Sequence, residues 1–305
     1  MKLISFSRIN NSKVHLGVIL NDTQLLDVTA LGSSPEGKAI GILPRSMEEL
    51  VADASQGLPA IRVALDSPSS DRYRLLLSEI SYAPPLKPNK NVFCIGRNYR
   101  EHIIEGNIAN GRPANSFPEA IEVFSKPPTA IVGHGANVLR HANLTVSLDY
   151  EVELGVVIGK AGRGISEADA LDHVFGYTVI NDITARDLQK RHGQWFKGKS
   201  LDTSCPIGPV ITHKDAIANP NALKLGLSVN GEERQSSSTD EMIFTVQAII
   251  AQLSAGMTLE PGDIIATGTP KGVGFALTPP RCLNVGDAVT AYVEGIGELR
   301  NVVVD

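Results

Sequence analysis

Three acidic side chains lie in two segments that otherwise have the composition of buried β-strands. Glu151 and Glu153 fall within residues 148–159, and Asp182 ends residues 177–182. Residues two apart on a strand point to the same side, so Glu151 and Glu153 should project together while their apolar neighbours face the other way. Neighbouring carboxylates repel each other and are costly to desolvate. The pattern therefore demands either an exposed acidic edge or a cation.

The ligand type favours a hard cation. Asp182, at the end of the second apolar segment, would supply a third carboxylate oxygen beside Glu151 and Glu153. Three carboxylates without clustered Cys or His favour Mg²⁺ or Mn²⁺ over zinc. An edge strand with a hydrated acidic face remains the alternative when the two glutamates are considered alone.

Composition excludes several classes of protein. The 305 residues allow one large domain or two smaller ones, and the net charge of −5 argues against a general nucleic-acid binder. No apolar run is long enough to cross a bilayer, so no membrane partner is expected. The N-terminus turns polar too early for a secretion signal, and three widely spaced cysteines fit reduced thiols. These features predict a cytoplasmic location.

Two domains are expected, with a boundary in the proline-rich residues 81–88. Residues 1–85 predict a small accessory α+β domain, and residues 86–305 a catalytic domain. In the first, residues 14–20 and 25–28 flank an Asn-Asp turn and predict a hairpin. Ser46 and Glu49 form a capping box that predicts a helix ended by Gly57.

The larger part is rich in strands. Residues 223–235 predict a hairpin around an Asn-Gly turn, and residues 288–293 and 299–304 predict another. An apolar stripe predicts a helix over residues 239–255 with Gly256 as its stop. The regular strand–helix alternation of a dinucleotide-binding fold is missing. The prediction is an α+β protein built on a mixed β-sandwich or roll.

Residues 193–200 match the P-loop pattern letter for letter, but their context is wrong. A P-loop joins a strand to a helix. Here the preceding residues 184–192 read as helical, and Pro206 and Pro209 follow. Nucleotide hydrolysis is therefore not predicted.

Two further groups of residues could carry chemistry. His102 and Glu105 are neighbours on a helical turn, where the carboxylate can orient the imidazole as a base, although such a pair is commonly a solvated surface pair. Arg186 and Gln189 follow Asp182 at helical spacing, so Arg186 could bind a substrate carboxylate or simply pair with a nearby acid. Lys199 could neutralise an enolate or alkoxide, or be an ordinary surface lysine.

Together these motifs resemble the fumarylacetoacetate hydrolase family. The resemblance covers about residues 90–301. It rests on segments that occur in the family's order: 96–99 with His102 and Glu105, 149–154, 181–187, 198–200, 205–206, 242–244 and 261–270. The N-terminal part resembles the small accessory domain of bacterial members more weakly.

The resemblance implies a mixed β-sandwich roll, a homodimer and one divalent ion per subunit. It implies that Glu151, Glu153 and Asp182 hold the metal, and that His102 and Glu105 activate water. It suggests Arg186, Gln189, Lys199 and Thr269 as substrate contacts, with Lys199 also catalytic. Residues 106–122 have a suitable composition for a lid that orders over the substrate.

The implied reaction is hydrolysis of the C–C bond of a 2,4-diketo acid such as fumarylpyruvate or maleylpyruvate. Water deprotonated by His102 would attack the distal carbonyl, Lys199 or a backbone amide would stabilise the oxyanion, and a Lewis acid would stabilise the leaving enolate. The same chemistry also supports an oxaloacetate-type decarboxylase, a 2-hydroxymuconate-type isomerase or tautomerase, and a ureidoglycolate-type lyase. A non-catalytic metal-binding scaffold is the remaining alternative. Contacts that select the acyl group are expected in the lid and near Lys126 and Arg234.

Overall fold

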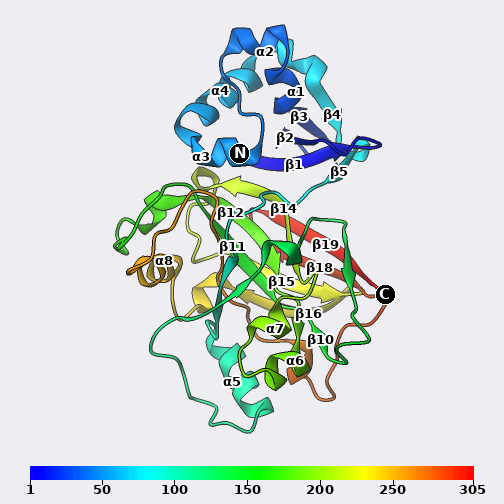
Figure 1. Cartoon of the computed structure of the whole chain (residues 1–305), viewed down its shortest axis with the longest axis vertical. Coiled ribbons are helices and arrows are strands. Elements are labelled where there is room, and N and C mark those ends of the chain that lie inside the picture. Colours follow the sequence, from blue (N-terminus) through cyan, green and yellow to red (C-terminus); the bar gives the residue numbers. More distant parts are fainter.

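The computed structural model describes residues 1–305, and its largest element is a mixed sheet of 12 strands (Figure 1). The main path of the sheet runs β4-β3-β2-β1-β14-β12-β11-β17-β6-β7, with β5 paired to β1 and β8 to β14. β6 pairs with β17, and β8 with β14, in parallel, and the other neighbours are antiparallel. The strands are β1 (Lys2–Arg8), β2 (Val14–Ile19), β3 (Gln24–Asp27), β4 (Arg74–Leu76), β5 (Ile80–Tyr82), β6 (Val92–Gly96), β7 (Glu122–Lys126), β8 (Ile131–Val132), β11 (Val152–Ile158), β12 (Val174–Asn181), β14 (Cys205–His213) and β17 (Ile264–Ala266).

A second sheet has the strand order β16-β15-β18-β19-β9. Its strands are β9 (Asn137–Leu139), β15 (Lys224–Val229), β16 (Glu232–Ser238), β18 (Ala288–Val293) and β19 (Gly297–Val304). Both hairpins expected here are present, and Asn230 adopts the positive φ of 53° that such a turn requires. A small ladder joins β10 (Leu148–Asp149) to β13 (Thr184–Ala185). The predicted α+β class with mixed sheets is confirmed.

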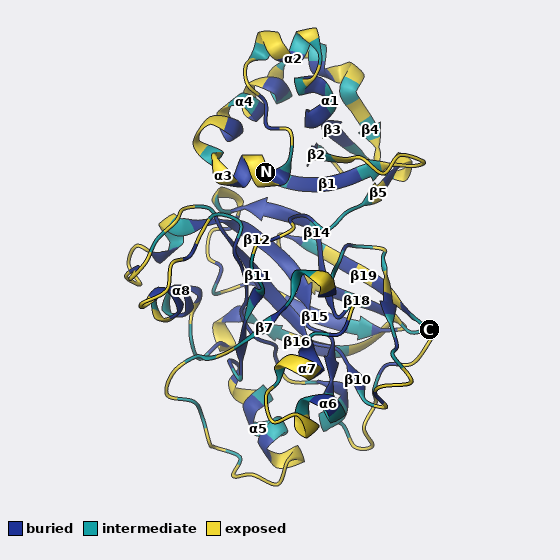
Figure 2. Ribbon diagram, in the orientation of Figure 1, coloured by how far each residue is buried: buried dark blue, intermediate teal, exposed yellow.

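The main core lies between these two sheets. Strand β11 alternates, with Val152, Leu154 and Val156 in the same apolar cluster as Leu225, Leu227 and other residues of the second sheet. Glu153, between two of these core residues, consequently points to the opposite face of β11. Figure 2 shows β11 and β12 as almost entirely buried. The apolar face of β11 packs into the core and holds the strand in place, so the opposite face can carry polar groups.

The N-terminal strands and four helices form the part at the top of Figure 1. The helices are α1 (Val28–Gly32), α2 (Pro35–Ile40), α3 (Met47–Ala52) and α4 (Ala54–Asp66). The hairpin β2–β3 is present as predicted, and β1 extends the main sheet by pairing with β14. Residues 80–82 still pair with β1, and the predicted domain division at residue 85 remains a prediction.

The predicted helix end at Gly57 is wrong. Ser46 does cap α3 by accepting the N–H of Glu49, but α3 ends at Ala52. Asp53 then caps a new helix by accepting the N–H of Gln56, so Gly57 lies inside α4. Asp53 therefore starts a second helix before Gly57, and the glycine does not end a helix.

The remaining helices are few, and none of the helices in the structure is both long and apolar enough to span a membrane. They are α5 (Arg100–Ala109), α6 (Arg186–Arg191), α7 (Phe196–Lys199) and α8 (Val246–Ser254). Short 3-10 helices are η1 (Pro68–Tyr73), η2 (Leu77–Glu79), η3 (Pro128–Ala130), η4 (Ala170–His173), η5 (Lys214–Ala216), η6 (Thr239–Glu241) and η7 (Gly274–Ala276).

Two sequence expectations concern these helices. The helix predicted over residues 239–255 is only partly correct, because α8 begins after Thr245, whose side chain accepts the N–H of Ala248. The residues before it form η6 and an extended segment held to Asn98. Residues 193–200 follow α6 and contain the short helix α7, and strand β14 follows at Cys205, which is not the strand–loop–helix context of a P-loop.

Candidate metal and catalytic site

The register of β11 and β12 brings the three acidic residues together. Val152 pairs with Asn181, so the residues just outside this pair, Glu151 and Asp182, lie opposite each other. The N–H of Asp182 donates to the carbonyl of Glu151 at 2.8 Å. Carboxylate oxygens of Glu151, Glu153 and Asp182 all lie within 4.8 Å of one another, and all three residues are buried. The acidic-edge alternative is excluded by this burial.

Each carboxylate has one oxygen held by a neighbouring cation or backbone N–H. Arg186 Nη2 lies 2.7 Å from Glu151 Oε1, and Lys126 Nζ lies 2.7 Å from Asp182 Oδ1. The backbone N–H of Gly268 donates to Glu153 Oε2 at 2.8 Å. These contacts set the orientation of all three side chains, a role that outer groups commonly play around metal ligands.

Lys199 bridges the remaining oxygens of two carboxylates. Its Nζ lies 2.6 Å from both Glu151 Oε2 and Asp182 Oδ2, and only 2% of the residue is exposed. Burial lowers the pKa of Lys199, but the charges of Asp182 and Glu151 outweigh it and the net shift is upward. Lys199 is therefore a buried cation at the acidic cluster, and the surface-lysine interpretation is wrong.

Glu153 differs from the other two carboxylates in having no cationic side chain within ion-pair distance. Burial raises the pKa of this carboxyl well above its ordinary value, and the charges of Asp182 and Glu151 raise it further. Burial acts in the same direction on Glu151, but Lys199 and Arg186 outweigh it and hold that pKa below its ordinary value. Glu151 and Asp182 are thus each paired with two fixed cations, while Glu153 lacks an ionic partner.

The residues present fit a divalent cation of the hard type. Three buried carboxylate oxygens within 4.8 Å form an all-oxygen donor set, with no Cys or His among them. Such a set suits Mg²⁺ or Mn²⁺. Burial first, and then the charges of Asp182 and Glu151, raise the pKa of Glu153, and a bound cation would offset both effects.

The proposed dyad is formed on α5. His102 Nδ1 lies 2.9 Å from Glu105 Oε1, and both side chains are largely buried. A short turn joins the end of β6 to α5. In this turn the side chain of Asn98 makes three hydrogen bonds, to the N–H and carbonyl of Phe244 and to the carbonyl of Thr267. These bonds anchor the turn that directs α5 over the site.

One loop contacts both the dyad and the surroundings of the acidic cluster. The N–H of Gly272 donates to both oxygens of Glu105, at 3.0 and 3.1 Å. Asp149, which is fully buried, accepts the N–H groups of Gly274 and Phe275 and also binds Arg186 Nε at 2.9 Å. The glycine-rich residues 268–275 therefore form a backbone wall that contacts both the helix α5 and the residues of the acidic cluster.

A cavity of about 470 Å³ joins these parts. Of the nine residues predicted from the sequence, seven line it: His102, Glu151, Glu153, Arg186, Gln189, Lys199 and Thr269. The other two, Glu105 and Asp182, lie directly behind lining residues and contact them. Arg97, Arg112 and Lys190 add positive charge to the wall. The cavity is thus suited to a small anion, and α5 with the residues following it forms one side.

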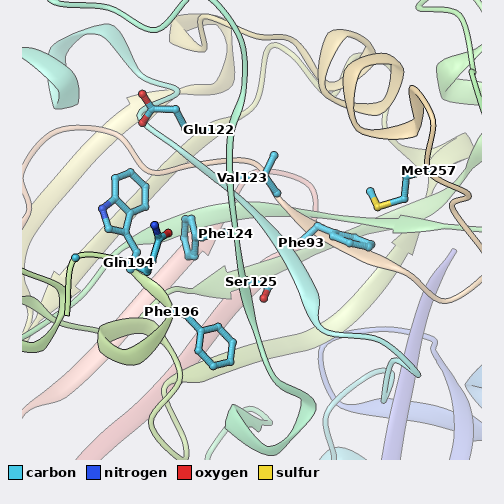
Figure 3. A pocket seen from close by; sticks show the side chains of 10 residues that line it. Phe93, Glu122, Val123, Phe124, Ser125, Gln194, Phe196 and Met257 are labelled. Carbon is cyan, nitrogen blue, oxygen red and sulfur yellow. The ribbon is translucent and has the colours of Figure 1, made fainter.

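A second cavity of about 470 Å³ lies on the other side of Phe124 and Trp195, both of which line the two cavities. Figure 3 shows Phe93, Phe124 and Phe196 around it, contributed by β6, β7 and α7. It contains no member of the acidic cluster or the dyad. The members of the acidic cluster and of the dyad that line a cavity therefore line the first one.

The structure changes the interpretation of two basic residues, and it adds an acidic and an amide residue to those that support the site. Neither Lys126 nor Arg234, expected near the acyl-selecting contacts, lines the cavity. Lys126 is completely buried behind Asp182 instead, and Arg234 pairs with Glu232. The roles of Asp149 and Gln235 were not predicted, because each acts through partners distant in the sequence.

Comparisons with known proteins agree with this geometry. Residues 91–304 match the family model described as Fumarylacetoacetate (FAA) hydrolase C-terminal. The oxaloacetate tautomerase YisK of Bacillus subtilis (strain 168) is 47% identical over 298 residues, which is 95% of this chain and 96% of that protein.

Solved structures show the same fold over the whole chain. A fumarylacetoacetate hydrolase from psychrophilic Exiguobacterium antarcticum superposes with a TM-score of 0.82 at 41% identity, covering 100% of this chain and 99% of that one. A maleylpyruvate hydrolase from Sphingobium sp. SYK-6, in complex with manganese(II) and pyruvate, superposes with a TM-score of 0.75 at 32% identity and the same coverage.

Proposed function

The chain belongs to the fumarylacetoacetate hydrolase family. We propose that it catalyses divalent-metal-dependent enolisation of a 2-oxo dicarboxylic acid, and that oxaloacetate is the preferred substrate. The observation that carries this proposal is that His102, held by Glu105, lines the same cavity as Glu151, Glu153 and Lys199. Such a cavity holds a base and a source of positive charge for the same small anion.

Binding would rest on the cationic side of the cavity. When bound by Glu151, Glu153 and Asp182, a divalent cation would supply a Lewis acid for the 2-oxo and carboxylate oxygens. Arg186 and Gln189 on α6 lie at the cavity wall within 3.5 Å of each other and would orient the substrate carboxylate.

His102 would transfer a proton from the carbon next to the 2-oxo group to the 2-oxo oxygen. Its Nδ1 is engaged by Glu105, which leaves Nε2 to take a proton from the carbon next to the 2-oxo group. Glu105 would hold the ring in place and stabilise the imidazolium that forms. Lys199, as a buried cation, would offset the negative charge that develops on the 2-oxo oxygen, and return of the proton to that oxygen completes the enol.

Enolisation is preferred to hydrolysis for two reasons. It needs one proton shuttle and no attacking water, and the relative that is 47% identical is an oxaloacetate tautomerase. Hydrolysis of an acylpyruvate such as fumarylpyruvate or maleylpyruvate is the second candidate, favoured by the maleylpyruvate hydrolase with the same fold. The imidazole of His102 could equally deprotonate water.

The test is a substrate panel assayed side by side with Mg²⁺, with Mn²⁺ and with EDTA. Proton NMR would follow oxaloacetate tautomers and any pyruvate formed, and loss of enol absorbance would follow acylpyruvates. Faster interconversion of oxaloacetate tautomers without pyruvate, abolished by EDTA, supports enolisation. Cleavage of acylpyruvate at a higher kcat/KM than oxaloacetate turnover would favour hydrolysis, and pyruvate from oxaloacetate would favour decarboxylation.

We also propose that the protein is a homodimer and that residues 106–122 close over bound substrate. Asn107 already holds this segment through the carbonyls of Ala114 and Ser116. Light scattering would measure the mass in solution, for comparison with 32.5 kDa for one chain. Protection of residues 106–122 from hydrogen exchange on adding substrate would support closure.

A further inference from the structure

Gln235 is a buried polar residue that the reaction outlined above does not use. It lies on β16, in the second sheet, and only 1% of it is exposed. Its side chain nevertheless reaches the main sheet, where it contacts both β11 and the glycine-rich wall. A buried amide of this kind is costly unless all its hydrogen bonds are made.

The orientation of the Gln235 amide is dictated by its partners. Its Oε1 accepts the N–H of Val152 at 2.9 Å, and a backbone N–H can only donate. Its Nε2 donates to the carbonyl of Pro270 at 2.8 Å, and a carbonyl can only accept. The side chain is therefore held at both ends, with its NH₂ group toward residues 269–270.

This orientation fixes the role of the Thr269 hydroxyl. Gln235 Nε2 lies 2.9 Å from Thr269 Oγ1, and because the NH₂ group must donate, the hydroxyl must accept. The proton of that hydroxyl is then free for another partner, and Thr269 donates no hydrogen bond within the protein. Thr269 is 3% exposed and lines the cavity that contains the acidic cluster.

We propose that Gln235 is a positioning residue that presents the Thr269 hydroxyl as a hydrogen-bond donor to an anionic oxygen of the substrate. The proposal rests on the proposed function in taking a 2-oxo carboxylate as the ligand. A hydrogen bond to a charged group is worth more than one to a neutral group. Without the amide, no donor holds the hydroxyl as an acceptor, and its proton is no longer directed to the cavity.

Pyruvate binding in the presence of saturating Mn²⁺ provides the test, measured by calorimetry on the wild type and on Gln235→Met, Thr269→Val and the double variant. Gln235→Met and Thr269→Val should each weaken pyruvate binding by roughly tenfold. The double variant should bind no more weakly than Thr269→Val alone, because both changes remove the same donated hydrogen bond. Thr269→Ser, which keeps the hydroxyl, should bind as the wild type does.

Gln247→Met is the matched control, since Gln247 bonds Asn221 away from the cavity, and its pyruvate affinity should be unchanged. Wild-type affinity in Gln235→Met, or losses that multiply in the double variant, would overturn the proposal. If Gln235→Met fails to fold, the pair Thr269→Val and Thr269→Ser decides, because equal binding by both excludes a donated hydrogen bond. Failure of the wild type to bind pyruvate would instead count against a 2-oxo acid ligand.

Discussion

Lys126 Nζ lies 2.7 Å from Asp182 Oδ1, and both side chains are completely buried. The ammonium group also donates to the carbonyl of Ile183 at 3.0 Å, so it holds both the side chain and the backbone at the end of β12. Since Lys199 contacts the other oxygen of the same carboxylate, Asp182 is fixed from two sides. The acidic cluster is thus supported by cations that come from two other parts of the chain.

Replacing Lys126 with Met should destabilise the protein by about 3 kcal/mol, because one oxygen of Asp182 would be left buried without its cation. Urea denaturation monitored by circular dichroism measures the free energy of unfolding. Lys197→Met, a change at an exposed lysine, should shift that free energy by less than about 0.5 kcal/mol. Equal free energies of unfolding for the two variants would show that the Lys126–Asp182 pair makes no net contribution to stability.

Glu153→Gln should weaken Mn²⁺ binding by about 100-fold or more while leaving the fold intact, because the amide keeps the shape but removes a charged ligand. Isothermal titration calorimetry gives the affinity directly. Glu167→Gln, at an exposed position, is the control and should bind Mn²⁺ as the wild type does. Unchanged affinity in Glu153→Gln would remove this residue from the ligand set.

The raised pKa of Glu153, caused first by burial and then by Asp182 and Glu151, predicts a pH dependence. The folded metal-free protein keeps a proton that the unfolded chain releases, so this contribution to stability is full below the unfolded-state pKa and is lost as the pH rises through the folded-state pKa. Metal-free wild type should therefore lose stability over that range, and Glu153→Gln should lose less.

Metal binding has the opposite dependence on pH, because the cation must displace the same proton. The Mn²⁺ affinity should increase by about tenfold per pH unit while the pH is below the raised pKa of Glu153. Calorimetry in two buffers with different enthalpies of ionisation counts the protons released. An affinity independent of pH, with no proton release, would contradict the assignment.

His102→Ala should lower kcat for the preferred substrate by about 10²- to 10⁴-fold, since it removes the proposed base. Mn²⁺ affinity should remain, because His102 is not among the three carboxylate residues of the cluster. Steady-state kinetics and calorimetry on the same preparation separate the two effects. Wild-type turnover in this variant would mean that another group transfers the proton.

Gly96→Ala should disturb the wall between the two cavities. A Cβ at residue 96 would lie 2.1 Å from a ring carbon of Trp195, so the indole must move. We expect a loss of about 1–3 kcal/mol in stability and a shift in fluorescence, which reports on Trp195 alone because the chain has one tryptophan. Gly106→Ala is the control, since its Cβ would make only an ordinary contact of 4.0 Å with Phe275.

The sequence alone indicated much of this arrangement because the informative signals are local. Strand periodicity placed Glu151 and Glu153 on one face, and an Asn-Gly turn placed a hairpin correctly. Helical spacing placed His102 beside Glu105. Helix ends were predicted less well, because Asp53 and Thr245 provide caps that compete with the glycine and periodicity signals.

Tertiary structure decided which groups surround the cluster. Lys126 reaches Asp182 across 56 residues, Gln235 reaches Thr269 across 34 residues, and Asp149 reaches Gly274 across 125 residues. No local pattern marks such pairs, because the side chains meet only when separate strands and loops pack together. The sequence determined which oxygens could bind a cation, and the packing of β7, α6, α7 and the loop after β17 around β11 and β12 determined which cations and backbone N–H hold those oxygens in place.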